Sequence, residues 1–213
     1  MDTPLIPDYL MEYLDKLVPA RPAEMQAMEA HAQKINFPII GPTSGYLCYQ
    51  VARMIGARRV FELGSGYGYS TAWFAKAVNE NGGGEVFHVV WDEALSQQAR
   101  QHLGVLGYDG MIYYHVGEAV QTLRETAGSF DLIFNDINKD GYAASLPVIV
   151  EKLRPGGVLI VDNMLWHGKV FEPDDKTPET TSVRKLTELL THSPDWIVSL
   201  APVRDGVMVA YKK

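Results

Sequence analysis

From residue 59 onward, short apolar runs alternate with longer segments in which apolar residues recur at helical spacing. The runs predict strands at 59–63, 86–90, 111–115, 130–135 and 157–161, and the periodic segments predict helices at 70–78, 93–106, 118–126, 142–153 and 182–190. Alternation of this length is typical of a parallel sheet with helices on both faces. Two further runs, 196–203 and 207–211, are joined through Arg204-Asp205-Gly206 and predict an antiparallel hairpin. The sequence therefore predicts an α/β protein.

The part of the chain before residue 37 has no strand signal. Its apolar positions recur at helical spacing, and Pro19 and Pro22 divide them into two predicted helices. After a loop, Thr43 or Ser44 is the expected cap of a helix at 45–55. The expected organisation is a single domain over 1–213, made of a helical extension at 1–36 and a core at 37–213.

Acidic and amide side chains follow two of the predicted strands at the point where each strand ends. Asp136 follows the strand at 130–135, and Asp162 and Asn163 follow the next strand along the chain. Because ligands of open α/β sheets bind beyond the carboxyl ends of the strands, we expect these side chains to converge there. Their oxygens, with Lys139 one turn away, predict a small divalent cation and a proton-transfer group in one pocket.

Each of these residues also has a purely structural interpretation. Asp136 is equally typical of a helix cap, the pair Asp162-Asn163 of a turn, and Lys139 of a solvated surface. The functional interpretation depends on their occurring together at adjacent strand ends.

A glycine-rich turn, Gly64-Ser65-Gly66-Tyr67-Gly68, follows the first strand and precedes a helix. Glycines in such a turn let the backbone approach a ligand closely and expose amide N–H groups. The dinucleotide fingerprint requires glycine where this chain has Tyr69, so a nicotinamide or flavin oxidoreductase is disfavoured. A turn needed only for tight packing is the alternative.

Charge and composition narrow the class of partner. The net charge of −7 argues against a nucleic-acid binder, which needs a basic face. The single cysteine, Cys48, excludes an intrachain disulfide framework and indicates a reducing compartment. The sequence shows neither a signal-peptide pattern nor an apolar run long enough to span a membrane. We therefore expect a soluble cytoplasmic protein without membrane partners.

Several short motifs together resemble the class I, S-adenosylmethionine-dependent methyltransferases, and more narrowly the metal-dependent catechol and caffeoyl-CoA O-methyltransferases. The motifs are Glu62-Leu63-Gly64 with Gly68-Tyr69-Ser70, Gly117-Glu118-Ala119, the segment from Asp136 through Lys139-Asp140 to Tyr142, and Gly156-Gly157 followed by Asp162-Asn163 and Trp166. The resemblance extends from about residue 38 to 211. It implies a Rossmann-like, seven-stranded, mostly parallel sheet and a homodimer.

The resemblance also implies a role for individual residues. S-adenosylmethionine would contact Ile40, Glu62, Gly64, Gly66, Gly68, Tyr69, Ser70, Asp92, Gly117, Glu118, Ala119 and Asp136. The divalent cation, expected to be Mg²⁺, would bind Asp136, Asp162 and Asn163. Lys139, as the catalytic base, would lie with Asn163 and Trp166 around a phenolic, catechol-like substrate. The implied reaction transfers a methyl group to one hydroxyl of that substrate.

One position departs from the family pattern. At the end of the second strand, where the family usually has a carboxylate for the ribose hydroxyls, this chain has Val90. Asp92 or Glu93 could take its place only if the loop bulges. The alternative function is therefore a cofactor-binding homologue with weak or lost turnover, against which the retained metal and lysine motifs argue.

Overall fold

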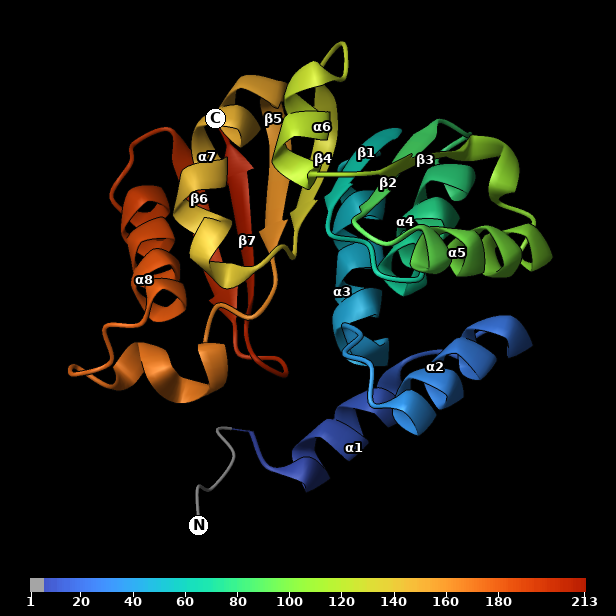
Figure 1. Cartoon of the computed structure of the whole chain (residues 1–213), viewed down its shortest axis with the longest axis horizontal. Coiled ribbons are helices and arrows are strands. Elements are labelled where there is room, and N and C mark those ends of the chain that lie inside the picture. Colours follow the sequence, from blue (N-terminus) through green and yellow to red (C-terminus); the bar gives the residue numbers. More distant parts are fainter. Residues whose placement is uncertain (1–5) are drawn as a thin grey trace.

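Seven strands form one sheet in the computed structural model, which describes residues 6–213. The strands are β1 (Arg59–Leu63), β2 (Glu85–Val90), β3 (Ile112–Val116), β4 (Phe130–Asn135), β5 (Leu153–Val161), β6 (Trp196–Ala201) and β7 (Val207–Lys212). Their order is β3-β2-β1-β4-β5-β7-β6, in which β7 runs antiparallel to both β5 and β6. This confirms the predicted mostly parallel sheet with an antiparallel C-terminal hairpin (Figure 1).

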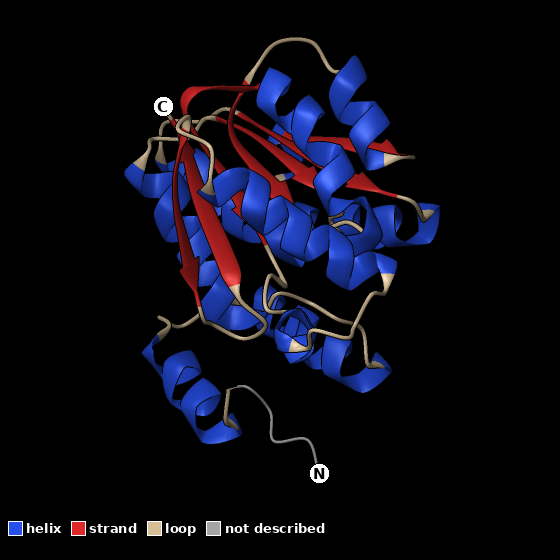
Figure 2. Cartoon of the chain, turned by 90° about the vertical axis from the view of Figure 1, so that its left-hand side faces the viewer, coloured by secondary structure: helices blue, strands red, loops and turns tan. Residues whose placement is uncertain are grey.

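Helices cover both faces of the sheet (Figure 2). One face carries α3 (Gly41–Met54), α4 (Tyr69–Glu80) and α5 (Glu93–Val105), and the other carries α6 (Ala119–Glu125), α7 (Tyr142–Lys152) and α8 (Pro178–Thr191). Successive strand residues alternate between the two cores: Val60 and Phe134 pack on the first face, Phe61 and Ile133 on the second. Because both faces are buried, the strands are apolar throughout.

The strand register brings three chain positions together at one edge of the sheet. Leu63 pairs with Asn135, and Asn135 pairs with Val161. The next residues are Gly64, Asp136 and Asp162, which therefore lie side by side where β1, β4 and β5 end. Main-chain hydrogen bonds continue the pairing there, from the N–H of Asp136 to Leu63 at 2.8 Å and from that of Asp162 to Asn135 at 3.2 Å. Strand order reverses between β1 and β4, the usual place for a ligand crevice.

Some predicted helix and strand boundaries are wrong. Helix α3 begins at Gly41 with Ile40 at its N-cap, so Thr43 lies inside the first turn, where Asp15 accepts from its main-chain N–H at 3.3 Å and from its hydroxyl at 2.5 Å. Helix α8 begins at Pro178, four residues before its predicted start, since proline suits the first helical turn. Strand β5 begins at Leu153, which pairs with β4 ahead of the glycines.

The sequence pattern also missed three short 3₁₀ helices, η1 (Asp109–Met111), η2 (Lys139–Gly141) and η3 (Trp166–Phe171). Two of them follow the ends of β4 and β5. Within residues 6–213, no helix combines the length and apolar character that crossing a membrane would require.

Candidate active site

The glycine turn after β1 is shaped by close backbone contacts. Gly64 has φ +88°, and a Cβ atom there would lie 2.6 Å from the carbonyl oxygen of Asp136. Gly66, at φ +51°, faces the Phe37 ring, which a Cβ would approach to 3.2 Å. The Ser65 N–H donates to Val89 at 2.9 Å, so the turn is fixed against β2 as well as β4. Side chains at these positions would fill the space through which a ligand could contact the protein backbone.

Glu62 is a fully buried carboxyl directly before this turn. Burial raises its pKa to about 8, and the nearby hydroxyls of Ser70, Thr71 and Ser65 act in the opposite direction. Thr71 donates to its Oε2 atom at 2.5 Å, whereas Oε1 has no partner among the described residues. An unpaired buried acceptor next to the glycine turn fits the ammonium group of an amino-acid ligand.

A buried histidine that the sequence pattern did not single out completes this network. His88 in β2 places Nδ1 3.1 Å from the Thr71 hydroxyl oxygen. Burial lowers the pKa of His88 to about 3, so the ring is neutral at physiological pH. Because Thr71 donates to Glu62, its oxygen accepts from a protonated Nδ1, and His88 positions the hydroxyl that holds Glu62.

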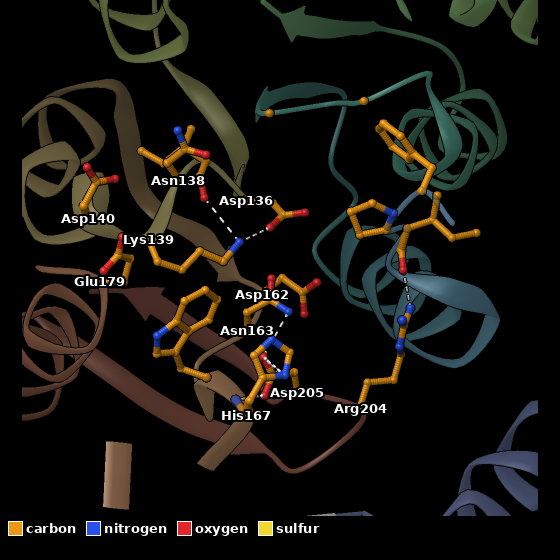
Figure 3. Close-up of a pocket in the computed structure, with 17 residues that line it drawn as sticks. Asp136, Asn138, Lys139, Asp140, Asp162, Asn163, His167, Glu179, Arg204 and Asp205 are labelled. Carbon is orange, nitrogen blue, oxygen red and sulfur yellow. Dashed lines mark hydrogen bonds and ion pairs between the residues drawn. The ribbon is translucent and has the colours of Figure 1, made fainter. Parts of the chain in front are cut away.

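Two carboxylates stand together at the ends of β4 and β5 (Figure 3). Burial and the charge of Asp136 raise the pKa of Asp162 to about 7. Burial also raises the pKa of Asp136, whereas Lys139, with Nζ 2.7 Å from Asp136 Oδ1, lowers it. Both carboxylates are therefore destabilised as anions by their surroundings, and a cation between them would relieve this.

Asn163 supplies the third expected oxygen. It adopts φ +55°, and its Nδ2 donates to Asp205 Oδ2 at 3.3 Å, which leaves the amide oxygen for another partner. Across residues 6–213, no three His, Cys, Asp or Glu side chains cluster in a way that could hold a metal ion. The candidate donor set is thus two carboxylates and one amide, hard oxygens that suit Mg²⁺ with water or substrate in the remaining positions.

Two residues position this set from a distance. The buried Tyr142 hydroxyl donates to the main-chain oxygen of Asp162 at 2.9 Å and so ties α7 to the end of β5. Asp205, in the β6–β7 turn, accepts from the main-chain N–H of His167 at 2.6 Å as well as from Asn163. Sequence analysis did not assign Asp205 to the site. The signal that could have indicated it is the charged pair Arg204-Asp205 between two apolar strands.

Residues that follow β1, β4 and β5 line one cavity of about 810 Å³. It brings together the sequence-predicted residues Gly64, Gly66, Asp136, Lys139, Asp162, Asn163 and Trp166. It also contains Phe37, Pro38, Ile39, Glu179, Arg204 and Asp205, which sequence analysis did not assign to the site. A smaller hollow of about 30 Å³ adjoins it, between the glycine turn and Ile40, Tyr69 and Ser70.

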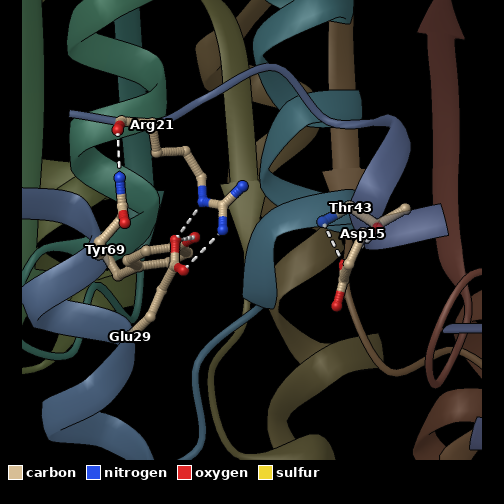
Figure 4. Close-up of polar contacts among 6 residues, drawn as sticks. Asp15, Arg21, Glu29, Thr43 and Tyr69 are labelled. Carbon is tan, nitrogen blue, oxygen red and sulfur yellow. Dashed lines mark hydrogen bonds and ion pairs between the residues drawn. The ribbon is translucent and has the colours of Figure 1, made fainter. Parts of the chain in front are cut away.

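The N-terminal helices α1 (Asp8–Leu17) and α2 (Ala23–Ile35) precede the segment 37–39, which lines this cavity. Glu29 of α2 accepts from Arg21 at 2.6 Å and from the Tyr69 hydroxyl at 2.7 Å. These contacts fix α2, which precedes Phe37, to α4, the helix that follows the glycine turn (Figure 4).

Other predicted cofactor residues have local structural partners. Asp92 caps α5 by accepting from Ala94 at 2.6 Å, and Glu118 caps α6 by accepting from Val120 at 2.9 Å. Neither they nor Gly117, Ala119 and Gly68 line the cavity, and Val90 is buried at the end of β2. Their contact with a cofactor stays a prediction.

The sequence pattern of the O-methyltransferase family matches residues 21–213. The chain belongs to the O-methyltransferase family. It is 28% identical to a catechol O-methyltransferase of Niastella koreensis over 71% of this chain and 69% of the relative. It is 32% identical to mouse catechol O-methyltransferase domain-containing protein 1 over 78% of this chain and 64% of the relative.

The fold agrees with solved structures of O-methyltransferases. TomG of Streptomyces achromogenes, solved in complex with SAM, superimposes with a TM-score of 0.86 at 25% identity, over 96% of each chain. This O-methyltransferase is thus an S-adenosylmethionine-dependent enzyme, as the sequence motifs implied. The glycine turn and the unpaired Glu62 oxygen fit that cofactor.

Proposed function

We propose that this O-methyltransferase transfers the methyl group of S-adenosylmethionine to one hydroxyl of a catechol-like small molecule, with help from a divalent cation. The observation that carries the proposal is the placement of Asp136, Asp162 and Lys139 in one cavity with the glycine turn. The proposed cation ligands, the amine of Lys139 and the glycine turn therefore lie at the same edge of the sheet.

On the cofactor side, the backbone of Gly64 and Gly66 lies beneath the amino-acid part of the cofactor. Glu62 Oε1 accepts from its ammonium group, and Ser70, at the start of α4, lies near its carboxylate. The bound cofactor supplies an electrophilic methyl group on sulfonium.

On the acceptor side, Asp136, Asp162 and the Asn163 amide oxygen hold the cation, which when bound acts as a Lewis acid toward a substrate hydroxyl. Lys139, whose Nζ atom lies 2.7 Å from Asp136 Oδ1, would accept the proton of that hydroxyl in its neutral form. Trp166, in η3 beside the cavity, forms a wall for the aromatic ring.

A pair of isomeric acceptors tests this function. Catechol has adjacent hydroxyls that can chelate one cation, whereas resorcinol has the same groups too far apart. We expect methylation of catechol with S-adenosylmethionine and Mg²⁺, loss of activity in excess chelator, recovery on adding Mg²⁺, and little turnover of resorcinol. Undiminished catechol methylation in excess chelator would disprove the metal-assisted mechanism.

We also propose that the enzyme is a homodimer. Helix α1 has no buried residue, and Tyr9, Tyr13 and Leu17 are 76%, 60% and 61% exposed. A second copy would cover this apolar face. Sedimentation of the wild type and of Tyr13→Glu tests it: dimer and monomer are expected, and a monomeric wild type would refute the proposal.

A further inference from the structure

Arg204 is a cation in the cavity wall with no carboxylate partner among residues 6–213. It lies in the turn between β6 and β7 and adopts φ +52°, which is uncommon outside glycine. Figure 3 shows its side chain across the cavity from Lys139. Lys139 forms an ion pair with Asp136, whereas Arg204 forms none in the described part of the chain. Arg204 is therefore the cation of the cavity wall that can still pair with an anionic ligand.

The Arg204 guanidinium is held in a notch of the segment after α2. Its Nη1 atom donates to the main-chain oxygen of Ile39, and a Cβ atom on Gly41 would lie only 2.5 Å from Nη1. The bare backbone of Gly41 therefore makes room for the guanidinium. The other guanidinium N–H groups donate to no acceptor in the described part of the chain.

The charge of Arg204 affects the pKa of both carboxylates in the site. Burial, the largest effect, raises the pKa of Asp136 and of Asp162, and Arg204 acts against it at both residues. Arg204 also lines a second cavity of about 1020 Å³ beside α1 and α2, which shares Phe37, Pro38 and Ile39 with the first. The guanidinium thus borders both cavities.

We propose that Arg204 binds a carboxylate carried by the acceptor, so that the preferred substrate is an aromatic acid with two adjacent hydroxyls. The inference rests on the proposed function, because it names the substrate class of the same site. A guanidinium presents paired N–H donors that match the two oxygens of a carboxylate. With its hydroxyls near Lys139, such an acceptor would direct its acid group to the opposite wall.

Two acceptors of nearly the same shape test the inference. One is 3,4-dihydroxybenzoate, and the other is 3,4-dihydroxybenzyl alcohol, which lacks the charge. The measured quantity is the ratio of their kcat/KM values with S-adenosylmethionine and Mg²⁺. The wild type should favour the acid, and Arg204→Gln should lower the ratio about 10- to 100-fold, mainly through the KM of the acid.

Two further variants separate a specific contact from general electrostatics. Arg204→Lys keeps the charge and should keep part of the preference. Lys34→Gln removes an exposed lysine that lines neither cavity, and should leave the ratio as in the wild type.

An unchanged ratio in Arg204→Gln would overturn the inference while leaving the proposed function intact. So would an equal loss in Lys34→Gln, which would show a long-range charge effect. Weaker binding of S-adenosylmethionine by Arg204→Gln at an unchanged ratio would assign the arginine to the cofactor. Failure of the wild type to methylate either acceptor would overturn the proposed function, and this inference with it.

Discussion

The two sides of the cavity are built in different ways. On the cofactor side, β1, the glycine turn and α4 are consecutive in the chain, and their shape comes from backbone packed against buried neighbours such as Glu62 and Thr71. On the acceptor side, the wall combines segments that are far apart in sequence, around residues 37–39, 136–140, 162–167, 179 and 204–205.

Backbone conformation shows the same contrast. Positive φ angles on the cofactor side occur at glycines, Gly64, Gly66 and Gly68, where they cost little. On the acceptor side they occur at Gly168 and Gly206, and also at four residues whose side chains make this conformation costly, Asn163, Trp166, His167 and Arg204. Such strain persists where the surroundings enforce it, commonly at functional sites. If the proposed function holds, the cofactor side is a general frame, and the acceptor side carries the chemistry and the specificity.

The largest expected effect comes from removing a carboxylate on the acceptor side. Asp162→Ala should lower kcat/KM by about 10³-fold or more, because a hard cation loses a full charge. Asn163→Ala should lower it less. Steady-state kinetics with Mg²⁺ measures both, with Asp174→Asn in the exposed loop as the control. A smaller loss in Asp162→Ala than in Asn163→Ala would contradict the assigned ligand set.

Lys139→Ala should lower kcat by about 10²–10⁴-fold by removing the general base. Binding of S-adenosylmethionine, followed by calorimetry, should change little because the lysine belongs to the acceptor side. Lys139→Arg should not rescue turnover, since a guanidinium stays protonated. Near-normal turnover in the arginine variant would show that Lys139 acts only through its charge.

On the cofactor side, Val90→Glu should tighten S-adenosylmethionine binding by about 1.5–3 kcal/mol, because it adds a charged acceptor for the ribose hydroxyls. Asp92, engaged as the cap of α5, is poorly placed to supply one. Calorimetric titration of wild type, Val90→Glu and the control Val90→Leu measures the effect. Tight binding by the wild type that the glutamate weakens would show that the ribose lies elsewhere.

The smallest expected effect concerns stability and pH. The folded-state pKa of Glu62 is raised to about 8 from 4.5, so the folded protein retains a proton that the unfolded chain has lost between these values. The contribution of Glu62 to stability is therefore fully present below about pH 4.5 and falls as pH rises through 8, by up to about 1.4 kcal/mol per pH unit.

Denaturant unfolding of wild type and Glu62→Gln between pH 6 and 7, without cofactor, checks this sign. The stability difference should shift toward the glutamine variant as pH increases, because glutamine does not titrate. A difference that is independent of pH would mean that Glu62 is ionised in the folded protein.

What could be predicted from the sequence depends on whether the signal is local in the chain or comes from a remote residue. Strand β4, the glycine turn and the residues after β4 and β5 were predictable, because apolar runs and glycines are signals within a few neighbouring residues. The parallel register of the strands then brings these residues together at one edge of the sheet. The β6–β7 turn was not, since Arg204 meets Ile39 across 165 positions of the chain. The start of α3 also involves a remote residue, Asp15, which accepts from the main-chain N–H and the hydroxyl of Thr43 in the first turn.

Direct binding of Mn²⁺, a paramagnetic substitute for Mg²⁺, tests the central claim that the acceptor side holds a divalent cation. The electron paramagnetic resonance signal of free Mn²⁺ would be followed while wild type or Asp162→Ala, each with bound S-adenosylhomocysteine, is titrated with the ion. The account predicts one bound ion per wild-type chain and at least about tenfold weaker binding by the variant. No binding by the wild type, or equal binding by both proteins, would contradict it.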